Sequence, residues 1–394
     1  MRTSVRFTVS AVAVSATVLA GLAAVAANSA GAAESQHTVV VQRAASGAIK
    51  GAYIVRLKAG TDARGLARAL RVSPRFVYTA AVNGFAADLT DGQLRALRRN
   101  AGVEAISEDA YVTDALEDTQ PNPPSWGIDR VDQRNLPLSA SYTYTAQGTG
   151  VNAYVIDTGI DVTHPDFEGR AVFEVNYIDR KNTDCDGHGT HVAGTVGSQT
   201  YGIAKDVRLH AVKILNCNGG GRTSATIKGV DWVTANAVKP AVANTSWNWS
   251  ADSTLEASLR AMISSGVFLA TSAGNTGADS CDRLPRKIET ALVTAASEKN
   301  DTRASYSSTG ACVDIYAPGS EILSTQPNNT TAVYNGTSMA TPHVTGTAAL
   351  YLQGNPTATP AQVKSYIESA GTPNVINGGS TGGTVNLLLY TNGL

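Results

Sequence analysis

The sequence carries no surplus of either charge. Its 394 residues include 31 lysines and arginines against 32 aspartates and glutamates, which gives a formal net charge of −1. Proteins that bind nucleic acid by neutralising phosphates depend on many lysine and arginine contacts. We therefore expect no nucleic-acid partner, although net charge alone does not exclude a local basic patch.

Long apolar runs are missing after residue 32, so we expect no membrane partner for the rest of the chain. Residues 1–32 are typical of a secretory signal peptide. Arg2 and Arg6 give a basic start, an almost uncharged run follows from Phe7 to Ala27, and Ala30-Gly31-Ala32 offers a small-x-small cleavage site. The alternative is a retained membrane anchor, which the many alanines of the run disfavour. The sequence thus predicts a secreted, extracellular protein.

Two catalytic signatures are also missing around the candidate residues. The sequence has no HExxH pattern, in which two histidines hold zinc and the glutamate acts as the base. Ser338, the serine considered below, lies in Gly-Thr-Ser-Met-Ala and not in the GxSxG elbow of α/β-hydrolases. We expect no catalytic metal, and an esterase of the α/β-hydrolase type is disfavoured.

The sequence has few cysteines, but their number is even. In an exported chain, four cysteines suggest two disulfides, for which three pairings are open. Four buried thiols are the alternative. Each bridge that closes a loop of about 30 residues would stabilise the fold by roughly 3–4 kcal/mol. The cysteines are Cys185, Cys217, Cys281 and Cys312.

Composition and patterning divide the rest of the chain into two parts. Residues 33–50 are rich in Ala, Ser and Gly and are expected to be flexible, whereas residues 51–115 have the β-α-β-β-α-β order of a small ferredoxin-like α+β module. A proline-rich stretch at 117–125 marks an exposed boundary, and the first part is taken to end at residue 117. The module is expected to have strands at 52–58, 76–90 (two strands joined at Asn83-Gly84) and 103–112, and helices at 62–72 and 91–100.

Residues 118–394 show apolar strands that alternate with helices. This alternation predicts an α/β domain with a mostly parallel central sheet covered on both faces, which makes three layers. In such sheets the functional residues gather at the carboxyl ends of the strands. The expected strands are 151–157, 209–215, 241–247 and 267–275, with helices such as 224–236 and 255–265 between them.

An acid and an imidazole follow this rule. Asp157 ends the first of these strands, whereas Asp161 and Asp166 lie beyond the following turn and are expected to be more solvated. His188 is expected at the opening of a helix, where it can point into a cleft, and His191 is expected to be structural. The alternative, a metal pair of His188 and His191, lacks a third ligand at usable spacing.

Ser338 stands at the start of an expected helix. We expect Pro342 in the first turn of this helix, where a proline costs little because the first N–H groups lack helical partners. The same N–H groups can hold a developing oxyanion. A serine there is more often a simple cap, but together with Asp157 and His188 a nucleophile is favoured. Asn275, at the carboxyl end of another strand, is the candidate second oxyanion donor, and the alternative is a turn residue.

The stretches that carry these residues resemble the subtilase family of serine endopeptidases. They are "AYVIDTGID" around Asp157, "DGHGTHVAGT" around His188 and "NGTSMATPHV" around Ser338, in the Asp…His…Ser order of which subtilisin is an example. The resemblance implies a subtilisin-like fold and a broadly specific endopeptidase that forms an acyl-enzyme. It gives Asp157, His188 and Ser338 the roles of the catalytic triad, and Asn275 that of the oxyanion residue.

The resemblance covers nearly the whole chain. Residues 51–115 resemble the family's inhibitory propeptide, so residues 33–117 are expected to help fold residues 118–394 and to inhibit them. We expect the enzyme to cut itself near residues 115–120. The stretch "PSWGIDRVDQRNLPL" at 124–138 resembles the mature start of the proteinase K branch, aqualysin-like enzymes in particular. The expected partners are the propeptide and protein or peptide substrates, and the expected state is a monomer.

The aqualysin-like branch also implies how the cysteines pair. The expected bridges are Cys185–Cys217 and Cys281–Cys312. The first bridge would pin the loop that carries His188.

The resemblance further implies substrate contacts. Gly219, Gly220 and Gly221 resemble the family's edge strand, which pairs with an extended peptide. Ser246-Trp247-Asn248 and Ala273-Gly274 resemble the walls of the pocket for the residue before the cut. Asn248 stands where the family usually has glycine, a departure at the rim of this pocket. Because no acid evidently lines the pocket, we expect it to accept apolar and aromatic side chains.

A structural calcium ion is the expected cofactor. Asp129, Asp132 and Gln133 have the spacing i, i+3, i+4, so one helical face could present their oxygen atoms to a hard cation. The alternative is a solvated helix face. The resemblance adds two serines to this site. The complete candidate set is Asp129, Asp132, Gln133, Ser139, Ser141 and, at a second site, Asp314.

Overall fold

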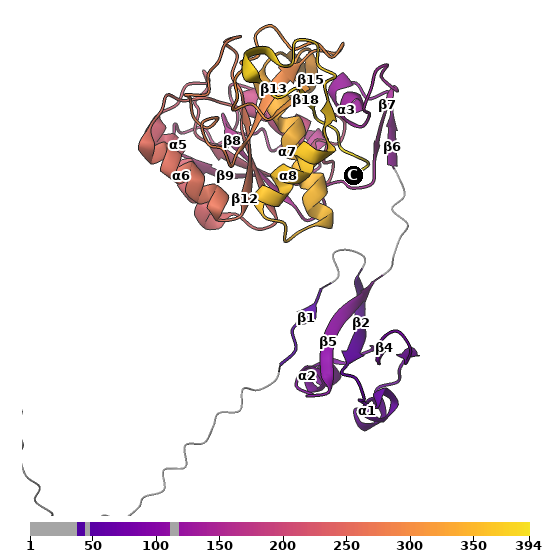
Figure 1. Ribbon diagram of the computed structural model, residues 1–394. Coiled ribbons are helices and arrows are strands. Elements are labelled where there is room, and N and C mark those ends of the chain that lie inside the picture. Colours follow the sequence, from indigo (N-terminus) through magenta and orange to yellow (C-terminus); the bar gives the residue numbers. More distant parts are fainter. Residues whose placement is uncertain (1–37, 44–47, 111–117) are drawn as a thin grey trace, which may run out of the picture. The chain divides into compact units, whose positions relative to one another are not determined.

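The structure is a computed structural model that describes residues 38–43, 48–110 and 118–394 (Figure 1). The predicted signal peptide lies outside the described residues, as does the first part of the expected processing region. The described chain forms two compact units, one mainly from residues 50–109 and one from residue 118 onward. Each unit has its own sheet and its own hydrophobic core.

The smaller unit is a five-stranded sheet with two helices. Its strand order, β1-β5-β2-β4-β3, contains the predicted β-α-β-β-α-β module, which is confirmed. The expectation that residues 33–50 are flexible was wrong for β1, which pairs in parallel with β5 and places Val41 opposite Ile106. The elements are β1 (Val41–Gln42), β2 (Ala48–Leu57), α1 (Ala63–Ala69), β3 (Phe76–Tyr78), β4 (Gly84–Asp88), α2 (Asp91–Arg98) and β5 (Val103–Ala110).

The larger unit is built on a nine-stranded sheet in the order β17-β18-β14-β13-β12-β11-β8-β10-β9. All described neighbours from β18 to β9 pair in parallel, and β17 and β18 are antiparallel. The predicted mostly parallel sheet is confirmed, and β8, β10, β11 and β12 are its four predicted strands. The strands are β8 (Asn152–Asp157), β9 (Ala171–Asn176), β10 (Arg208–Lys213), β11 (Ala241–Thr245), β12 (Val267–Ser272), β13 (Leu292–Ser297), β14 (Ile315–Pro318), β17 (Thr372–Pro373) and β18 (Leu387–Leu388).

Helices cover both faces of this sheet (Figure 1). Along β8, Ala153 and Val155 enter one core with α4, α7 and α8, while Tyr154 and Ile156 enter the other with α5 and α6. Because successive strand residues point to opposite faces, a strand that is buried on both faces reads as one apolar run. The three layers are therefore confirmed. The helices are α4 (His188–Gly197), α5 (Thr223–Asn236), α6 (Ser253–Ser264), α7 (Thr337–Gly354) and α8 (Pro360–Ala370).

Shorter elements surround these layers. Two antiparallel pairs are formed by β6 (Asp118–Pro121) with β7 (Ser141–Tyr144) and by β15 (Ile322–Gln326) with β16 (Thr330–Tyr334). The remaining helical turns are α3 (Trp126–Val131), η1 (Pro165–Phe167) and η2 (Thr381–Gly383). Within the described ranges, no helix has the length and apolar character needed to cross a membrane.

The buried helix α7 contains Pro342 in its second turn. Because the helix begins at Thr337, the expectation of a first-turn proline was wrong. A proline here leaves the carbonyl four residues earlier, that of Ser338, without its helical partner. The Ser246 hydroxyl, just after β11, donates to that carbonyl at 3.0 Å. A neighbouring strand end thus replaces the missing helical bond.

Glycines let α4, α7 and the loop after α4 approach one another closely. A Cβ on Gly346, in the middle of α7, would lie 2.6 Å from the Cβ of Ile203 and 3.1 Å from the carbonyl oxygen of Val196. A Cβ on Gly354, at the end of the same helix, would meet nothing within 4 Å. The position of α7, and with it that of Ser338, therefore depends on a bare backbone at Gly346.

We expect Gly346→Ala to lower the free energy of unfolding by about 1–3 kcal/mol, as overpacked cores do. Gly354→Ala should leave it unchanged or raise it slightly, because alanine favours helix and the space is open. Thermal unfolding of both, in a Ser338→Ala background that cannot digest itself, measures the difference. Equal melting temperatures for the two variants would contradict the packing role of Gly346.

Candidate active site

The buried carboxylate of Asp157 ends β8 at the carboxyl edge of the sheet. Its Oδ1 lies 2.7 Å from Nδ1 of His188 and accepts a second hydrogen bond of 2.7 Å from the backbone N–H of Thr158. Its Oδ2 is buried and has no partner among the described residues. The first two predicted residues are thus brought together as the sequence predicted.

His188 is the first residue of α4, and its side chain is 25% exposed. The turn before it is fixed by the buried Asp184, whose carboxylate accepts from the N–H of Gly187 at 2.9 Å and from both the N–H and the hydroxyl of Thr190. Burial lowers the pKa of the His188 imidazole, but the attraction of Asp157, with smaller contributions from Asp186 and Asp184, outweighs burial. The net pKa is raised above its usual value.

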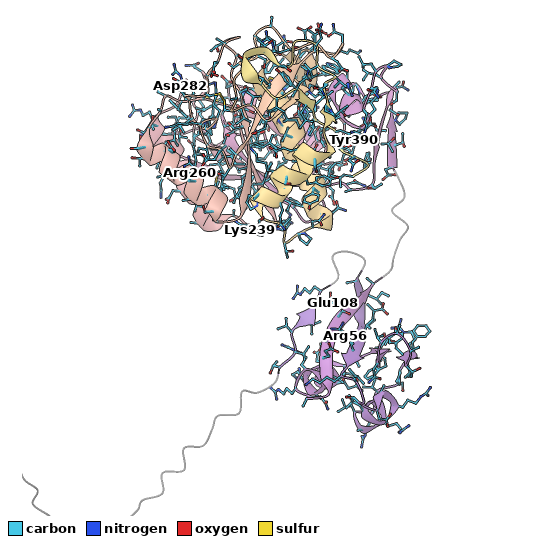
Figure 2. The ribbon with its side chains drawn as sticks, viewed as in Figure 1. Arg56, Glu108, Lys239, Arg260, Asp282 and Tyr390 are labelled. Carbon is cyan, nitrogen blue, oxygen red and sulfur yellow. A yellow bond between two sulfur atoms is a disulfide. The ribbon has the colours of Figure 1, made fainter. Side chains whose placement is uncertain are left out.

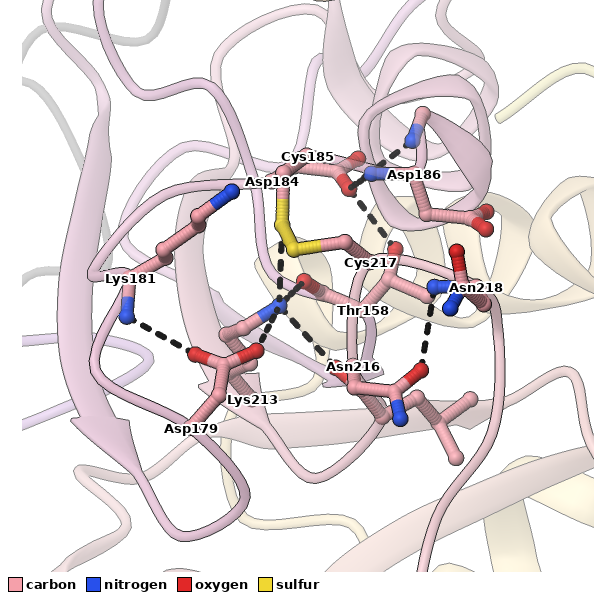
Figure 3. The surroundings of a disulfide bond; sticks show 12 residues. Thr158, Asp179, Lys181, Asp184, Cys185, Asp186, Lys213, Asn216, Cys217 and Asn218 are labelled. Carbon is pink, nitrogen blue, oxygen red and sulfur yellow. Dashed lines mark hydrogen bonds and ion pairs between the residues drawn. A yellow bond between two sulfur atoms is a disulfide. The ribbon is translucent and has the colours of Figure 1, made fainter.

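Lys213 supports Asp157 from the neighbouring strand. It ends β10 opposite Asp157 in the sheet register and is fully buried. Its ammonium donates to the carbonyl of Thr158 at 2.5 Å and pairs with Asp179 at 3.5 Å (Figure 3). A buried ammonium is tolerated only with such partners, and here one of them is the residue directly after the acid.

Both predicted disulfides are confirmed. Cys185 pairs with Cys217, and Cys281 pairs with Cys312. The first bridge joins the turn before His188 to the loop after β10, beside the Lys213 ammonium (Figure 3). It therefore pins the loop that carries the imidazole.

Ser338 is the second residue of α7 and forms a reciprocal pair with Ser246. The Ser338 hydroxyl donates to the Ser246 carbonyl at 3.0 Å, and the Ser246 hydroxyl donates to the Ser338 carbonyl at 3.0 Å. Within the described part of the chain, no hydrogen bond joins the Ser338 hydroxyl to the His188 imidazole. Ser246, predicted as a substrate contact, also holds the backbone of the candidate nucleophile.

The amide of Asn275 is oriented by Thr337. Asn275 Oδ1 accepts from the N–H of Thr337 at 3.0 Å and from its hydroxyl at 2.9 Å, and that hydroxyl oxygen accepts from the N–H of Gly274 at 3.0 Å. The amide nitrogen is left facing Gly336, where a Cβ would lie 3.3 Å away. The exposed Asn275 thus presents its NH₂ group beside the start of α7.

His191 has a structural place, as predicted. It is fully buried, and its Nε2 lies 3.0 Å from the carbonyl of Ile322 and 3.1 Å from that of Ala332. Burial lowers its pKa to about 4. The ring therefore links α4 to the β15–β16 hairpin.

A cavity of about 520 Å³ opens beside His188. The predicted substrate residues Gly219, Gly220, Gly221, Ser246, Trp247 and Asn248 all line it. Asp186 lines this cavity too, whereas the expectation that no acid lines the pocket concerned the pocket for the residue before the cut and stays a prediction.

Ala273 and Gly274 do not line this cavity and are buried. The prediction that they wall the pocket for the residue before the cut stays a prediction, and the buried guanidinium of Arg286 lies next to Gly274. A Cβ on Gly274 would overlap that guanidinium. Burial lowers the pKa of Arg286 to about 10. Sequence reasoning missed Arg286, since nothing local marks an arginine as buried.

The predicted calcium residues gather between α3 and β7, but not on one helical face. Because α3 ends at Val131, Asp132 is its C-cap and Gln133 follows it. The Ser139 N–H donates to Asp129 Oδ1 at 3.1 Å and to Gln133 Oε1 at 2.9 Å, and the Ser139 and Ser141 hydroxyls lie 2.8 Å apart. The predicted residues of this site therefore lie together, but the helical face on which they were expected does not exist.

Asp132 gives this cluster the character of a cation site. Its Oδ2 accepts from the N–H of Thr143 at 2.7 Å, but its Oδ1 is buried without a partner among the described residues. Burial, with a smaller contribution from the charge of Asp129, raises its pKa to about 7. An oxygen-only set around an unpaired buried carboxylate oxygen fits a hard divalent cation.

Asp314 does not fit the second calcium site. Its Oδ2 lies 2.8 Å from the ammonium of Lys364 and accepts from the N–H of Val293 at 2.8 Å. Lys364 of α8 already neutralises this carboxylate, so the prediction of a calcium ligand fails. The sequence around Asp314 gives no sign of this distant partner.

Comparison with known proteins agrees with this architecture. Residues 148–383 match the subtilase family, and residues 71–114 match the peptidase inhibitor I9 family. The chain is 48% identical over 320 residues to an extracellular serine proteinase of Thermus sp. (strain Rt41A), and the aligned residues cover 80% of this chain and 77% of the relative. It is 43% identical over 320 residues to alkaline serine exoprotease A of Vibrio alginolyticus, covering 80% of this chain and 60% of the relative.

A solved structure is similar as well. The crystal structure of a cold adapted subtilisin-like serine proteinase has a TM-score of 0.66 and 44% sequence identity, covering 68% of this chain and 97% of the other. The chain therefore belongs to the subtilase family, as a serine peptidase with a peptidase inhibitor I9 domain ahead of its catalytic domain.

Proposed function

We propose that the catalytic domain cleaves internal peptide bonds of proteins with broad specificity through Asp157, His188 and Ser338. One observation carries the proposal: the 2.7 Å bond between Asp157 and His188 lies at the carboxyl edge of the sheet, where α7 also begins. A carboxylate-held imidazole next to a serine at a helix start is the arrangement that activates a hydroxyl.

The chemistry needs one side-chain rotation. The Ser338 hydroxyl leaves its bond to the Ser246 carbonyl and turns toward His188, which takes its proton as the hydroxyl oxygen attacks the scissile carbonyl. His188 then gives this proton to the leaving amine, and water repeats the sequence on the acyl-enzyme. Asp157 keeps the imidazole in the required tautomer and stabilises its cationic form.

The oxyanion of the tetrahedral intermediate has two proposed donors. One is the amide nitrogen of Asn275, which Thr337 holds beside Gly336. The other is the N–H of Ser338, which as a first-turn group has no helical acceptor. Donors that are fixed before reaction stabilise developing charge without the cost of reorganising.

Two other functions are less well supported. The first is a catalytically silent subtilase that only binds peptides. A serine-directed phosphonate tests this function, because labelling of Ser338 would exclude it. An esterase of the α/β-hydrolase type would need a serine between a strand and a helix. The letters GxSxG do occur at Gly378–Gly382, but Ser380 is exposed and precedes the single turn η2.

We infer that the chain is exported and matures by cutting itself. The signal-like residues 1–32, two disulfides and the extracellular relative support export. The inhibitor family match at residues 71–114 supports residues 33–117 as an inhibitory propeptide. We expect the C-terminal end of this propeptide to occupy the active site until cleavage near residues 115–120. The expected mature product is a monomer that spans residues 118–394.

We propose one structural calcium ion between α3 and β7. Asp129, Asp132, Ser139 and Ser141 would hold it, with Gln133 beside them. The ion would pair the buried Oδ1 of Asp132 and tie the segment after α3 to the start of β7.

Ser338→Ala should stop self-processing and lower peptide turnover by several orders of magnitude, since it removes the proposed nucleophile. Mass spectrometry of the secreted product should show only the signal-processed precursor. Maturation of this variant at the normal rate would contradict self-cleavage. Ser380→Ala, which changes the exposed serine of the GxSxG letters, should mature normally and serves as the control.

The rate should depend on the raised pKa of His188. Because the base must be neutral, kcat/KM should rise with pH through a value above the usual 6.5 of histidine. Asp186→Asn removes one carboxylate that raises this pKa. The rise of kcat/KM with pH (the acid limb of the profile) should therefore move to lower pH by about a few tenths of a unit. Asp231→Asn, on the exposed face of α5, should leave the limb in place. A shift to higher pH in Asp186→Asn would contradict the electrostatic account.

Removal of calcium should destabilise the catalytic domain. EDTA should lower the melting temperature of the Ser338→Ala protein by several degrees, as loss of a ligand from the native state does. Asp132→Asn should abolish this calcium dependence, whereas Asp314→Asn should preserve it because Lys364 neutralises that carboxylate. An unchanged melting temperature in EDTA would argue against the site.

A further inference from the structure

The substrate cavity beside His188 contains one unexplained charge. Apart from His188 and Asp186, the lining residues are apolar or neutral, and they include Leu215, Trp247, Trp249 and Gly219–Gly221. Asp186 is the one carboxylate among the lining residues. A lone carboxylate in a wall of this kind can bind a positively charged group of a ligand.

Asp186 is held firmly in place. It lies in the turn before α4, next to the disulfide-bonded Cys185, and its N–H donates to Asp184 Oδ1 at 3.1 Å (Figure 3). Its own Oδ1 accepts from the N–H of His188 at 3.2 Å. The carboxylate is therefore fixed relative to the imidazole and does not swing freely on a loop.

The second oxygen of this carboxylate faces the glycine segment. A Cβ on Gly219 would lie 3.7 Å from Asp186 Oδ2, so the bare backbone leaves the oxygen accessible. No lysine or arginine of the described chain lies within 4.0 Å of this carboxylate. Burial, together with repulsion from Asp184 and Asp157, raises its pKa, so a cation placed beside it would relieve an unfavourable charge.

The path of an extended substrate decides which of its side chains meets Asp186. A peptide paired with Gly219–Gly221 turns successive side chains to opposite sides. If the residue before the cut points toward Ser246–Asn248, its neighbour on the N-terminal side points the other way, toward His188 and Asp186. The carboxylate is then within reach of the end of a long side chain at this second position.

We propose that Asp186 makes the peptidase favour lysine or arginine as the second residue before the cut bond. The inference rests on the proposed function, because it takes Ser338 as the nucleophile and the glycine segment as the pairing edge. Broad specificity at the residue before the cut is left unchanged.

Matched peptides test the proposal on the mature enzyme. The substrates share every residue except the second before the cut, which is lysine, its uncharged near-isostere norleucine, or glutamate. The wild type should cleave the lysine peptide with a kcat/KM about two- to five-fold above that of the norleucine peptide, the range expected for a partly exposed ion pair. Glutamate should be the poorest, and added salt should narrow the differences.

Asp186→Asn should bring the ratio of lysine to norleucine close to one. Asp282→Asn removes an equal charge from an exposed residue outside the cavity and should keep the wild-type ratio (Figure 2). A ratio of one in the wild type, or a lysine preference that survives in Asp186→Asn, overturns the proposal. Phosphonate titration of Ser338 separates the two claims: unlabelled enzyme that cuts no peptide refutes the proposed function, whereas labelled enzyme without a lysine preference refutes only the role of Asp186.

Discussion

The 2.7 Å bond between the buried Oδ1 of Asp157 and Nδ1 of His188 is the constraint on which the rest of the site depends. A buried carboxylate is costly unless it is hydrogen bonded or paired. This pairing requires the carboxyl end of β8 to meet the first residue of α4. The turn held by Asp184, the bridge from Cys185 and the ammonium of Lys213 all act on that junction. The surroundings therefore fix a geometry that two side chains alone could not keep.

The start of α7 solves a second conflict. Ser338 must stand at a helix opening, yet Pro342 removes a helical bond from its carbonyl. The Ser246 hydroxyl supplies the missing donor, and the Ser246 carbonyl receives the Ser338 hydroxyl in return. Because both bonds come from Ser246, directly after β11, the candidate nucleophile is tied to the cavity wall. Thr337 adds the link to Asn275, so three segments far apart in sequence share one hydrogen-bond network.

Elements with strong local patterns were predictable. The apolar runs of β8, β10, β11 and β12 and the spacing in α5 and α6 required only periodicity. The prediction for Asp314 failed, and Arg286 was missed, because each depends on a partner from elsewhere in the chain. Asp314 meets Lys364, and Gly274 meets Arg286, and neither pairing leaves a local trace. Asp186 was visible in the motif before His188, but its place in the cavity wall depends on Gly219, which follows β10.

The sequence by itself determined the order of the strands and helices, the triad residues as candidates and their family. These properties follow from apolar periodicity and from short contiguous motifs, both of which are local. Tertiary structure alone decided the hydrogen bond between Asp157 and His188, the replacement of a lost helical bond by Ser246 and the single acid in the substrate cavity. Each of these depends on distances between segments that are 30 or more residues apart in the chain. Such distances are fixed only when both faces of the sheet are packed.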